Sequence, residues 1–272
     1  MNLPEKNMTE ENMTGESKPL SPEAAEMQYR DMIQKVARAI AQNRTDDVLP
    51  YLGKKYEARH VEMFIDGNYD KRIDVLIRLM PFVSEDEDFE NFEELAMQFA
   101  DSKQVRSYEG STEECDAMLE WLEETQNLTL EQQDTVACQR ARYDVEHQAR
   151  ANRSKHIRFQ ELVTVAVELL EQLGDNDELT IHVNPAVSWS YLKSKKFLDE
   201  DESPPVSALY YADDDEVRTA MFEPAGQILL DRLIDLSPCH FSQWAALADE
   251  IDTAELKEFA MGLTQLHLIA FS

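Results

Sequence analysis

The hydrophobic pattern divides the chain into a long helical part and a shorter mixed part. Over residues 22–173, apolar side chains recur at three- and four-residue spacing, which is typical of amphipathic helices. The first predicted helix runs from Pro22 to Asn43, and Ser21 precedes it as a candidate N-cap. Strand signals are absent from this part, so the sequence predicts a helical domain here.

Two features of the helical part indicate breaks between helices. Gly67-Asn68 separates predicted helices over residues 57–65 and 69–80, as a turn or a local kink, because glycine and asparagine favour turns. The longest helical stretch, residues 130–173, has a candidate break at Asn152.

After residue 178 the period of the pattern changes from helical to two, which is typical of strands. This part predicts three strands and then three short helices. The strands are residues 179–183, 206–211 and 216–222, and the helices are residues 224–236, 240–249 and 253–267. The connector 186–203 is expected to contain one helical turn, and the turn-forming residues 212–215 join the last two strands as a hairpin.

The order of these elements predicts an α+β fold with two domains. A helical domain spans residues 22–173, and a small winged-helix-like domain of three strands and three helices spans residues 179–272. The first 21 residues are mostly polar and are expected to form a disordered tail.

The strongly acidic composition limits the partners of the chain. It has 55 acidic and 26 basic side chains and a formal net charge of -29, so attraction to nucleic acid or to an anionic membrane is not expected. No signal peptide or transmembrane stretch is found. The three cysteines, Cys115, Cys138 and Cys239, are an odd number at wide spacing, so we expect buried, reduced thiols in a cytoplasmic protein.

The strand from Glu216 to Phe222 is the candidate ligand-binding element. As the last strand of a hairpin it is expected at a sheet edge, where an extended peptide adds as another strand and its side chains enter a groove beside the helix 253–267. Proline in place of Met221 is expected to remove a ladder donor and to disturb the edge strand, and so to weaken peptide binding. The alternative is that the helical domain covers this edge. The candidate peptide-binding residues are Val217, Arg218, Thr219, Ala220, Met221, Phe222, Leu256, Phe259, Ala260 and Leu263.

DNA recognition by this domain is poorly supported. A winged helix that binds DNA needs basic residues on its recognition helix. Residues 250–272 instead contain four acidic side chains and one lysine, Lys257.

Arg140, Arg142, Tyr143 and Arg150 form the most arginine-rich patch of the sequence. Guanidinium groups pair well with carboxylates, so these residues are candidates for docking a carboxylate-bearing surface of a partner protein. The alternative is that they pair with the chain's own acidic excess. The acidic run over residues 84–94 leaves a similar choice between a site for a basic partner and a solvated helix start.

Residue patterns typical of catalysis are missing from the sequence. The seven glycines form no phosphate-binding loop, dinucleotide fingerprint or nucleophile elbow. The six histidines include no pair at the short spacing of zinc or iron sites. We therefore expect no catalytic centre, metal or cofactor in this chain.

Two stretches carry a resemblance to a protein family. Residues 56–99 contain an Asn-Tyr pair, a helix ended by proline, an acidic turn and an aromatic helix, and the matching residues are Asn68, Tyr69, Ile73, Leu76, Pro81, Phe89, Leu95 and Phe99. The second stretch is LTIHVNPAVSWSYLKSKKF, residues 179–197, followed by the hairpin and by FEPAGQILLDRLIDLSP, residues 222–238. Both resemble the partner proteins that are encoded beside multinuclear iron-dependent oxidases. Met80-Pro81 in place of the usual Phe-Pro and an acidic connector over residues 199–202 depart from the family pattern.

This resemblance implies a non-catalytic subunit. Such proteins form a heterodimer with a barrel-shaped oxidase that carries the iron ions, and they help present a ribosomally made precursor peptide whose cysteine is oxidatively modified. The methanobactin and thiaglutamate pathways are examples. The second domain is then similar to the peptide-recognition elements of peptide-natural-product enzymes. A transcription regulator and a structural adaptor protein are the alternative functions.

Overall fold

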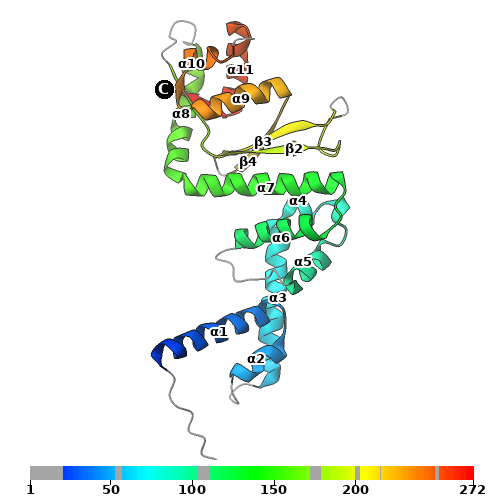
Figure 1. Ribbon diagram of the computed structural model, residues 1–272. Helices are drawn as coiled ribbons and strands as arrows, with labels where there is room; N and C mark the ends of the chain where they lie inside the picture. The colour runs from blue at the N-terminus through cyan, green and yellow to red at the C-terminus, as the bar shows by residue number, and fades with distance from the viewer. Residues whose placement is uncertain are drawn as a thin grey trace, which may run out of the picture. The chain divides into compact units, whose positions relative to one another are not determined.

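The computed structural model describes residues 21–52, 57–102, 111–171, 179–199, 203–214, 216–248 and 251–272 (Figure 1). The chain forms two compact units, residues 1–69 and 70–272. The expected disordered tail lies outside the described residues, apart from Ser21.

The first unit is helical. Its elements are α1 (Pro22–Ala41), α2 (Thr45–Leu52) and the first half of α3 (Ala58–Leu79). Ser21 caps α1 as expected, because its hydroxyl accepts a hydrogen bond from the Ala24 N–H at 3.2 Å. The buried residues that hold these helices together are Ala39, Val48, Val61 and Ile65.

The break expected at Gly67-Asn68 is wrong, because α3 runs unbroken through both residues. The side-chain amide of Asn68 donates to the Phe64 carbonyl one turn earlier, at 2.6 Å. A glycine inside a helix costs only about 1 kcal/mol relative to alanine, so its effect on a long helix is small.

The second unit begins with short helices and continues with two long ones. The short helices are α4 (Pro81–Ser84), η2 (Glu87–Phe89), α5 (Phe92–Asp101) and α6 (Ser111–Thr125). The long helices are α7 (Leu130–Ala151) and α8 (Arg153–Glu171), which leaves the end of α7 at a steep angle (Figure 1). The expected break at Asn152 is confirmed, because this residue ends α7.

Two antiparallel three-stranded sheets follow in the described residues. The sheet β5-β1-β6 contains β5 (Cys239–His240), β1 (Thr180–Val183) and β6 (Ile269–Phe271). The sheet β2-β3-β4 contains β2 (Val187–Leu192), β3 (Val206–Asp213) and β4 (Glu216–Phe222). The helices α9 (Pro224–Leu236), α10 (Phe241–Ala245) and α11 (Thr253–Gln265) complete the fold. The α+β fold with an N-terminal helical region is therefore confirmed.

The strand pairing differs from the sequence prediction. The helical turn expected within residues 186–203 is wrong, because β2 forms there and packs Trp189 and Leu192 on opposite faces of its sheet. Strand β1 pairs with β5 and β6 and not with the hairpin. The sequence prediction also missed β6, in which all three residues are buried.

Asn184 connects the two sheets. Its Nδ2 donates to the Ala212 carbonyl of β3 at 2.7 Å, and its Oδ1 accepts from the Ala186 N–H at 3.1 Å. Its own N–H donates to the Leu268 carbonyl, next to β6, at 2.9 Å. The side chain is buried, so the hydrogen bonds of this single residue fix the position of the segment that joins β1 to β2.

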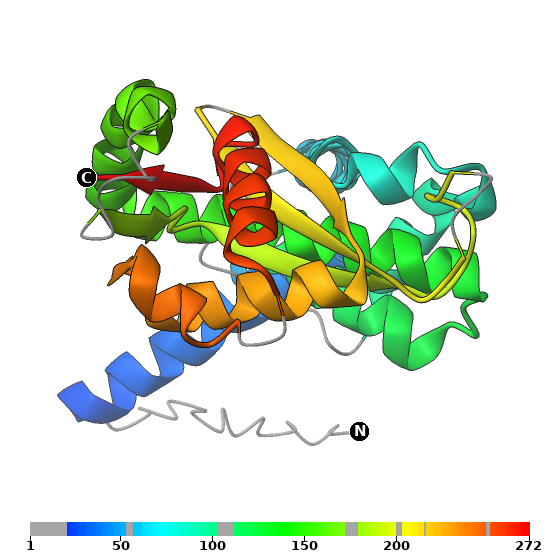
Figure 2. The same ribbon diagram turned by 90° about the horizontal axis from the view of Figure 1, so that it is seen from above.

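The sheet β2-β3-β4 is packed on both faces. Figure 2 shows α9 and α11 lying over it, where Leu209 and Tyr211 of β3 enter the core that includes Trp244. On the other face, Ala208 and Tyr210 pack against α7. Because both faces of this sheet are covered, its edges are the remaining places where a ligand could bind to it.

Candidate functional site

Strand β4 is one edge of the sheet β2-β3-β4, as expected from the sequence. The Ala212 N–H donates to the Ala186 carbonyl at 3.1 Å, toward β2. Because backbone groups alternate in direction along an antiparallel strand, Tyr211 bonds toward β4, and its partner Arg218 bonds back toward β3. The alternate residues of β4 therefore direct their backbone N–H and C=O groups away from the sheet, and these residues are Val217, Thr219 and Met221.

The outward edge of β4 is open among the described residues. Apart from the β3–β4 ladder, no backbone hydrogen bond from a described residue reaches this strand. Met221 is also 39% exposed. An unpaired strand edge of this kind can accept a further strand.

Two side chains at the end of β4 belong to the protein interior. Ala220 and Phe222 face the core beneath α9 and α11. The Phe222 ring packs edge-on against Trp189 and Phe259, with ring centroids 5.6 and 6.4 Å apart. Strand β4 is therefore anchored on its core side, while its edge stays open.

The apolar face of α11 forms core and not a groove. Leu256, Ala260 and Leu263 are 1%, 0% and 1% exposed, and Phe259 is partly buried against Phe222. An amphipathic stripe packs wherever a facing element covers it, and here α8 and β6 lie against α11. These three predicted peptide-binding residues are therefore closed to a peptide in this structure.

A buried carboxylate fixes the hairpin beside β4. Asp213 is 3% exposed, and its side chain contacts His267 Nδ1 at 2.8 Å and Arg218 Nη1 at 2.9 Å. His267 has a φ of 57°, in the left-handed region that often follows a helix, and it turns the chain from α11 toward β6. Arg218, another predicted peptide-binding residue, therefore has an internal partner.

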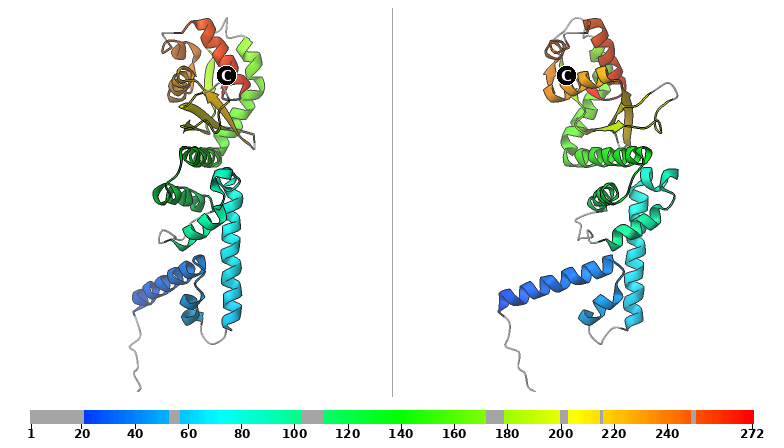
Figure 3. Two further views of the ribbon diagram at one scale, coloured as in Figure 1. Left: turned by 90° about the vertical axis from the view of Figure 1, so that its right-hand side faces the viewer. Right: turned by 45° about the vertical axis from the view of Figure 1, so that its right-hand side comes forward.

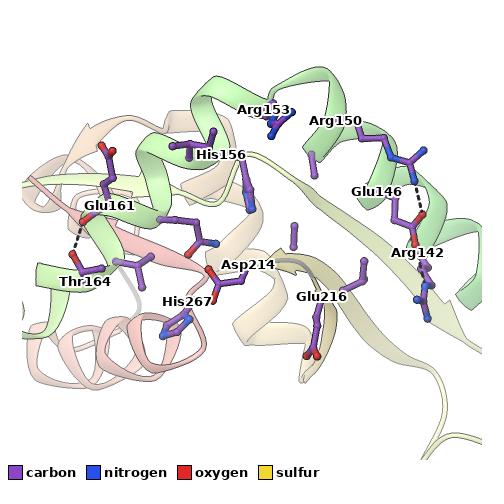
Figure 4. A pocket seen from close by; sticks show the side chains of 16 residues that line it. Arg142, Glu146, Arg150, Arg153, His156, Glu161, Thr164, Asp214, Glu216 and His267 are labelled. Carbon is purple, nitrogen blue, oxygen red and sulfur yellow. Dashed lines mark hydrogen bonds and ion pairs between the residues drawn. The ribbon is translucent and has the colours of Figure 1, made fainter.

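A cleft of about 1500 Å³ opens beside the start of β4. Glu216 and Val217 line one side of it, and residues of α7 and α8 line the other (Figure 4). The two helices meet at a corner, which Figure 3 shows from two further sides. The outward backbone of Val217 thus lies at an open space between the strand and this corner.

The predicted docking arginines have internal partners. Arg140 pairs with Glu123 at 2.7 Å, and Arg142 and Arg150 share Glu146 at 3.2 and 3.3 Å. These ion pairs agree with the alternative interpretation, in which the arginines pair with acidic side chains of the same chain. Arg142 and Arg150 also line the cleft beside β4, so the structure brings two separately predicted sites together.

Tyr143 is placed differently from the arginines. It is buried, its hydroxyl donates to the Leu79 carbonyl at 2.6 Å, and burial raises its pKa. The prediction that Tyr143 docks a partner is therefore wrong in this structure. Its side chain lies on the side of α7 away from Ala141 and Val145, which pack against the sheet, because residues two positions apart on a helix point in nearly opposite directions.

The acidic run over residues 84–94 also has an internal partner. Lys196, in the loop after β2, pairs with Asp86 at 2.5 Å and with Asp88. Thr135 donates to Asp86 at 2.6 Å. Burial acts to raise the pKa of Asp86, but the hydrogen bonds from Lys196, Thr135 and the Asp88 N–H outweigh it and hold the pKa below the usual 3.8.

The three cysteines are free and buried, as expected. Burial raises the pKa of the Cys115 thiol to about 12, so this thiol is protonated and unreactive near neutral pH.

In the part of the chain that the structure describes, no group of three or more His, Cys, Asp or Glu side chains is arranged to hold a metal ion. The described helices include none with the length and apolar character needed to cross a membrane.

The α8 side of the cleft was not predicted from the sequence. His156 and Gln160 line it, although neither stands in a motif. A single histidine and a single glutamine on an amphipathic helix carry no signal until the facing strand is known.

Comparisons with family models, curated proteins and solved structures found no match to this chain.

Proposed function

We propose that this chain is a non-catalytic partner subunit that binds a ribosomally synthesised precursor peptide and presents its cysteine to an iron-dependent oxidase. The peptide binds as an extended strand along the open edge of β4, and one end of it enters the cleft beside α7 and α8. This chain contributes the orientation of the peptide, and the iron lies in the oxidase.

The open edge of β4 carries this proposal. Val217, Thr219 and Met221 direct backbone donors and acceptors outward, and no described residue bonds them. In strand addition these main-chain groups supply the affinity, and neighbouring pockets supply the specificity. The cleft beside Val217 provides such a pocket, in place of the groove expected on α11, and the partly exposed Met221 side chain adds an apolar contact.

The proposal includes a heterodimer in the cytoplasm. Arg140 and Arg150 keep 41% and 69% of their side chains exposed, so both remain accessible to carboxylates of the oxidase surface. Three free, buried cysteines are typical of a reducing compartment.

Met221→Pro tests the strand addition. The Met221 N–H faces away from β3 and is not a donor of the β3–β4 ladder, which differs from the expectation from the sequence. Proline therefore removes a donor for the guest strand and spares this ladder. The probe is a fluorescein-labelled synthetic peptide with the precursor sequence encoded beside this chain's gene. Fluorescence anisotropy should show binding weakened by at least about tenfold, because one main-chain bond is lost and the guest strand is displaced.

Met221→Ala is the matched control, since it keeps the backbone N–H and removes only the side chain. It should bind within about threefold of the wild type, and circular dichroism should show that both variants are folded. Unchanged affinity in a folded Met221→Pro variant would contradict strand addition at β4. A chain that co-elutes with the oxidase in gel filtration but binds no peptide would instead be a structural adaptor.

A further inference from the structure

The α8 side of the cleft holds polar atoms that no described residue satisfies. Both ring nitrogens of His156 and the Nε2 of Gln160 are buried and have no hydrogen-bond partner among the described residues. Buried polar groups are normally paired, because an unpaired one costs free energy. The two residues are four positions apart on α8 and so share the face of the helix that lines the cleft.

Most of these atoms are hydrogen-bond donors. A glutamine Nε2 carries two N–H groups, and a neutral imidazole carries one. Arg153, one turn earlier on α8, adds an exposed guanidinium that lines the same cleft and forms no ion pair with a described residue (Figure 4). We call Arg153, His156 and Gln160 the α8 wall.

The acidic side chains of the cleft do not satisfy the α8 wall. Glu146 is already shared by two arginines of α7. Glu161, Asp214 and Glu216 are exposed, so water can hydrate their carboxylates, and none of them forms an ion pair with Arg153 or His156. No described residue accepts from these buried donors, so a bound molecule that offers an acceptor can satisfy them.

We infer that the α8 wall binds a carboxylate of the guest peptide, either its C-terminal carboxylate or an Asp or Glu side chain. A carboxylate can accept from His156 and Gln160 and pair with the Arg153 guanidinium at the same time. Because Val217 lines the same cleft, a strand that adds along β4 leads into the space in front of this wall. This inference rests on the proposed function and adds the chemistry of the guest.

The test uses peptides selected on the full chain from a random library displayed with free C-termini. One binder that loses affinity for Met221→Pro is synthesised as the free acid, as the C-terminal amide, and with each Asp or Glu changed to Asn or Gln. Affinities are measured by fluorescence anisotropy at fixed salt concentration. Removing the recognised carboxylate should weaken binding to the wild-type chain by about tenfold.

Variants of the chain identify the wall. Arg153→Gln should weaken the free-acid peptide by about tenfold, and Gln160→Met by a smaller factor. In Arg153→Gln the difference between carboxylate and amide peptides should largely disappear, because the two changes remove the same interaction. Lys155→Gln is the matched control: this exposed cation is on the same helix but does not line the cleft, and its variant should bind within about twofold of the wild type.

The arms of the test separate the outcomes. Loss of affinity on amidation assigns the site to the C-terminal carboxylate, and loss on an Asp or Glu change assigns it to a side chain. Equal affinity of every peptide form, or equal effects of Arg153→Gln and Lys155→Gln, would overturn the inference while peptide binding at β4 stands. A library that yields no binder sensitive to Met221→Pro contradicts the proposed function itself.

Discussion

The two edges of the sheet β2-β3-β4 differ in the hydrogen-bond partners of their outward backbone groups. At the two ends of the β2 edge, α7 supplies side-chain acceptors, to the outward N–H of Val187 and to the N–H groups of the two residues that follow Leu192. The outward N–H groups of Trp189 and Tyr191, between these ends, donate no hydrogen bond to a described residue. Gln148 Oε1 accepts from the Val187 N–H at 3.2 Å, and the Asp134 carboxylate accepts from the Lys193 N–H at 2.8 Å and the Ser194 N–H at 2.7 Å. At the β4 edge, no described backbone group or helix does the same.

This difference shows how a helix can close a sheet without adding a strand. An open edge promotes unwanted pairing between chains, so proteins usually block it. Here α7 packs under both β2 and β3, and its polar side chains bond the two ends of the β2 edge but not the β4 edge. The open β4 edge is therefore the side on which a guest strand is expected.

Asp134→Ala should have the largest effect on the closed edge. Asp134 is buried, and its loss leaves the Lys193 and Ser194 N–H groups without their charged acceptor. We expect the free energy of unfolding to fall by about 3 kcal/mol, because hydrogen bonds to charged groups are strong and buried donors are costly to leave unpaired. Urea denaturation followed by circular dichroism measures this change.

Asp144→Ala is the matched control on the same helix. Its exposed carboxylate accepts from the Ser188 hydroxyl of the same strand at 3.1 Å. Its loss should cost no more than about 0.5 kcal/mol, because the bond is exposed to water. If the two variants lose the same free energy of unfolding, the hydrogen bonds of Asp134 to the backbone after β2 contribute no more to stability than an exposed side-chain hydrogen bond.

The open edge could be predicted from the sequence, whereas the closed edge could not. The turn-forming residue types at 212–215 separate two alternating stretches of the sequence, and a hairpin leaves its last strand at an edge unless another strand joins it. Asp134 and Gln148 instead act on backbone groups far along the chain, and a polar residue on a helix gives no sign of such a partner.

The same limit explains the errors at the candidate site. An amphipathic stripe such as Leu256, Ala260 and Leu263 shows that a helix has an apolar face, but only packing decides whether that face meets a sheet or a ligand. Tyr143 was grouped with its arginine neighbours, although successive residues of a helix point in different directions. The α+β order of elements was predictable because it depends on local periodicity alone.

Acid should loosen the loop that follows β2. The pKa of Asp86 is held below 3.8, so its interactions stabilise the fold above that pH and are lost as the pH falls through the lowered pKa. Burial acts to lower the pKa of Lys196, but its partners Asp86 and Asp88 hold this pKa above 10.5. The contribution of the Lys196 charge to stability is therefore lost only when the pH rises through that raised pKa.

Asp86→Asn should therefore reduce the free energy of unfolding near neutral pH by about 2 kcal/mol. The difference from the wild type should shrink as the pH falls below about 4, because the carboxylate of the unfolded wild-type chain is protonated first, and should vanish once the pH is below the lowered pKa of folded Asp86. Urea denaturation over a pH series measures it. Asp47→Asn, which loses an exposed ion pair to Arg44, is the control and should change stability by less than about 0.5 kcal/mol. A difference that does not depend on pH would exclude a charge-based role for Asp86.

Gln148→Ala should have the smallest effect and compares the two edges most directly. It removes the acceptor of the Val187 N–H, so we expect a loss of about 1 kcal/mol in stability. Hydrogen exchange resolved by residue should show a faster Val187 amide, approaching that of Val217, which has no such acceptor among the described residues. The Val217 amide should be unchanged by this variant and should slow only when a peptide binds. If Val187 and Val217 already exchange at the same rate in the wild-type chain, the side chain of α7 does not close the β2 edge in solution.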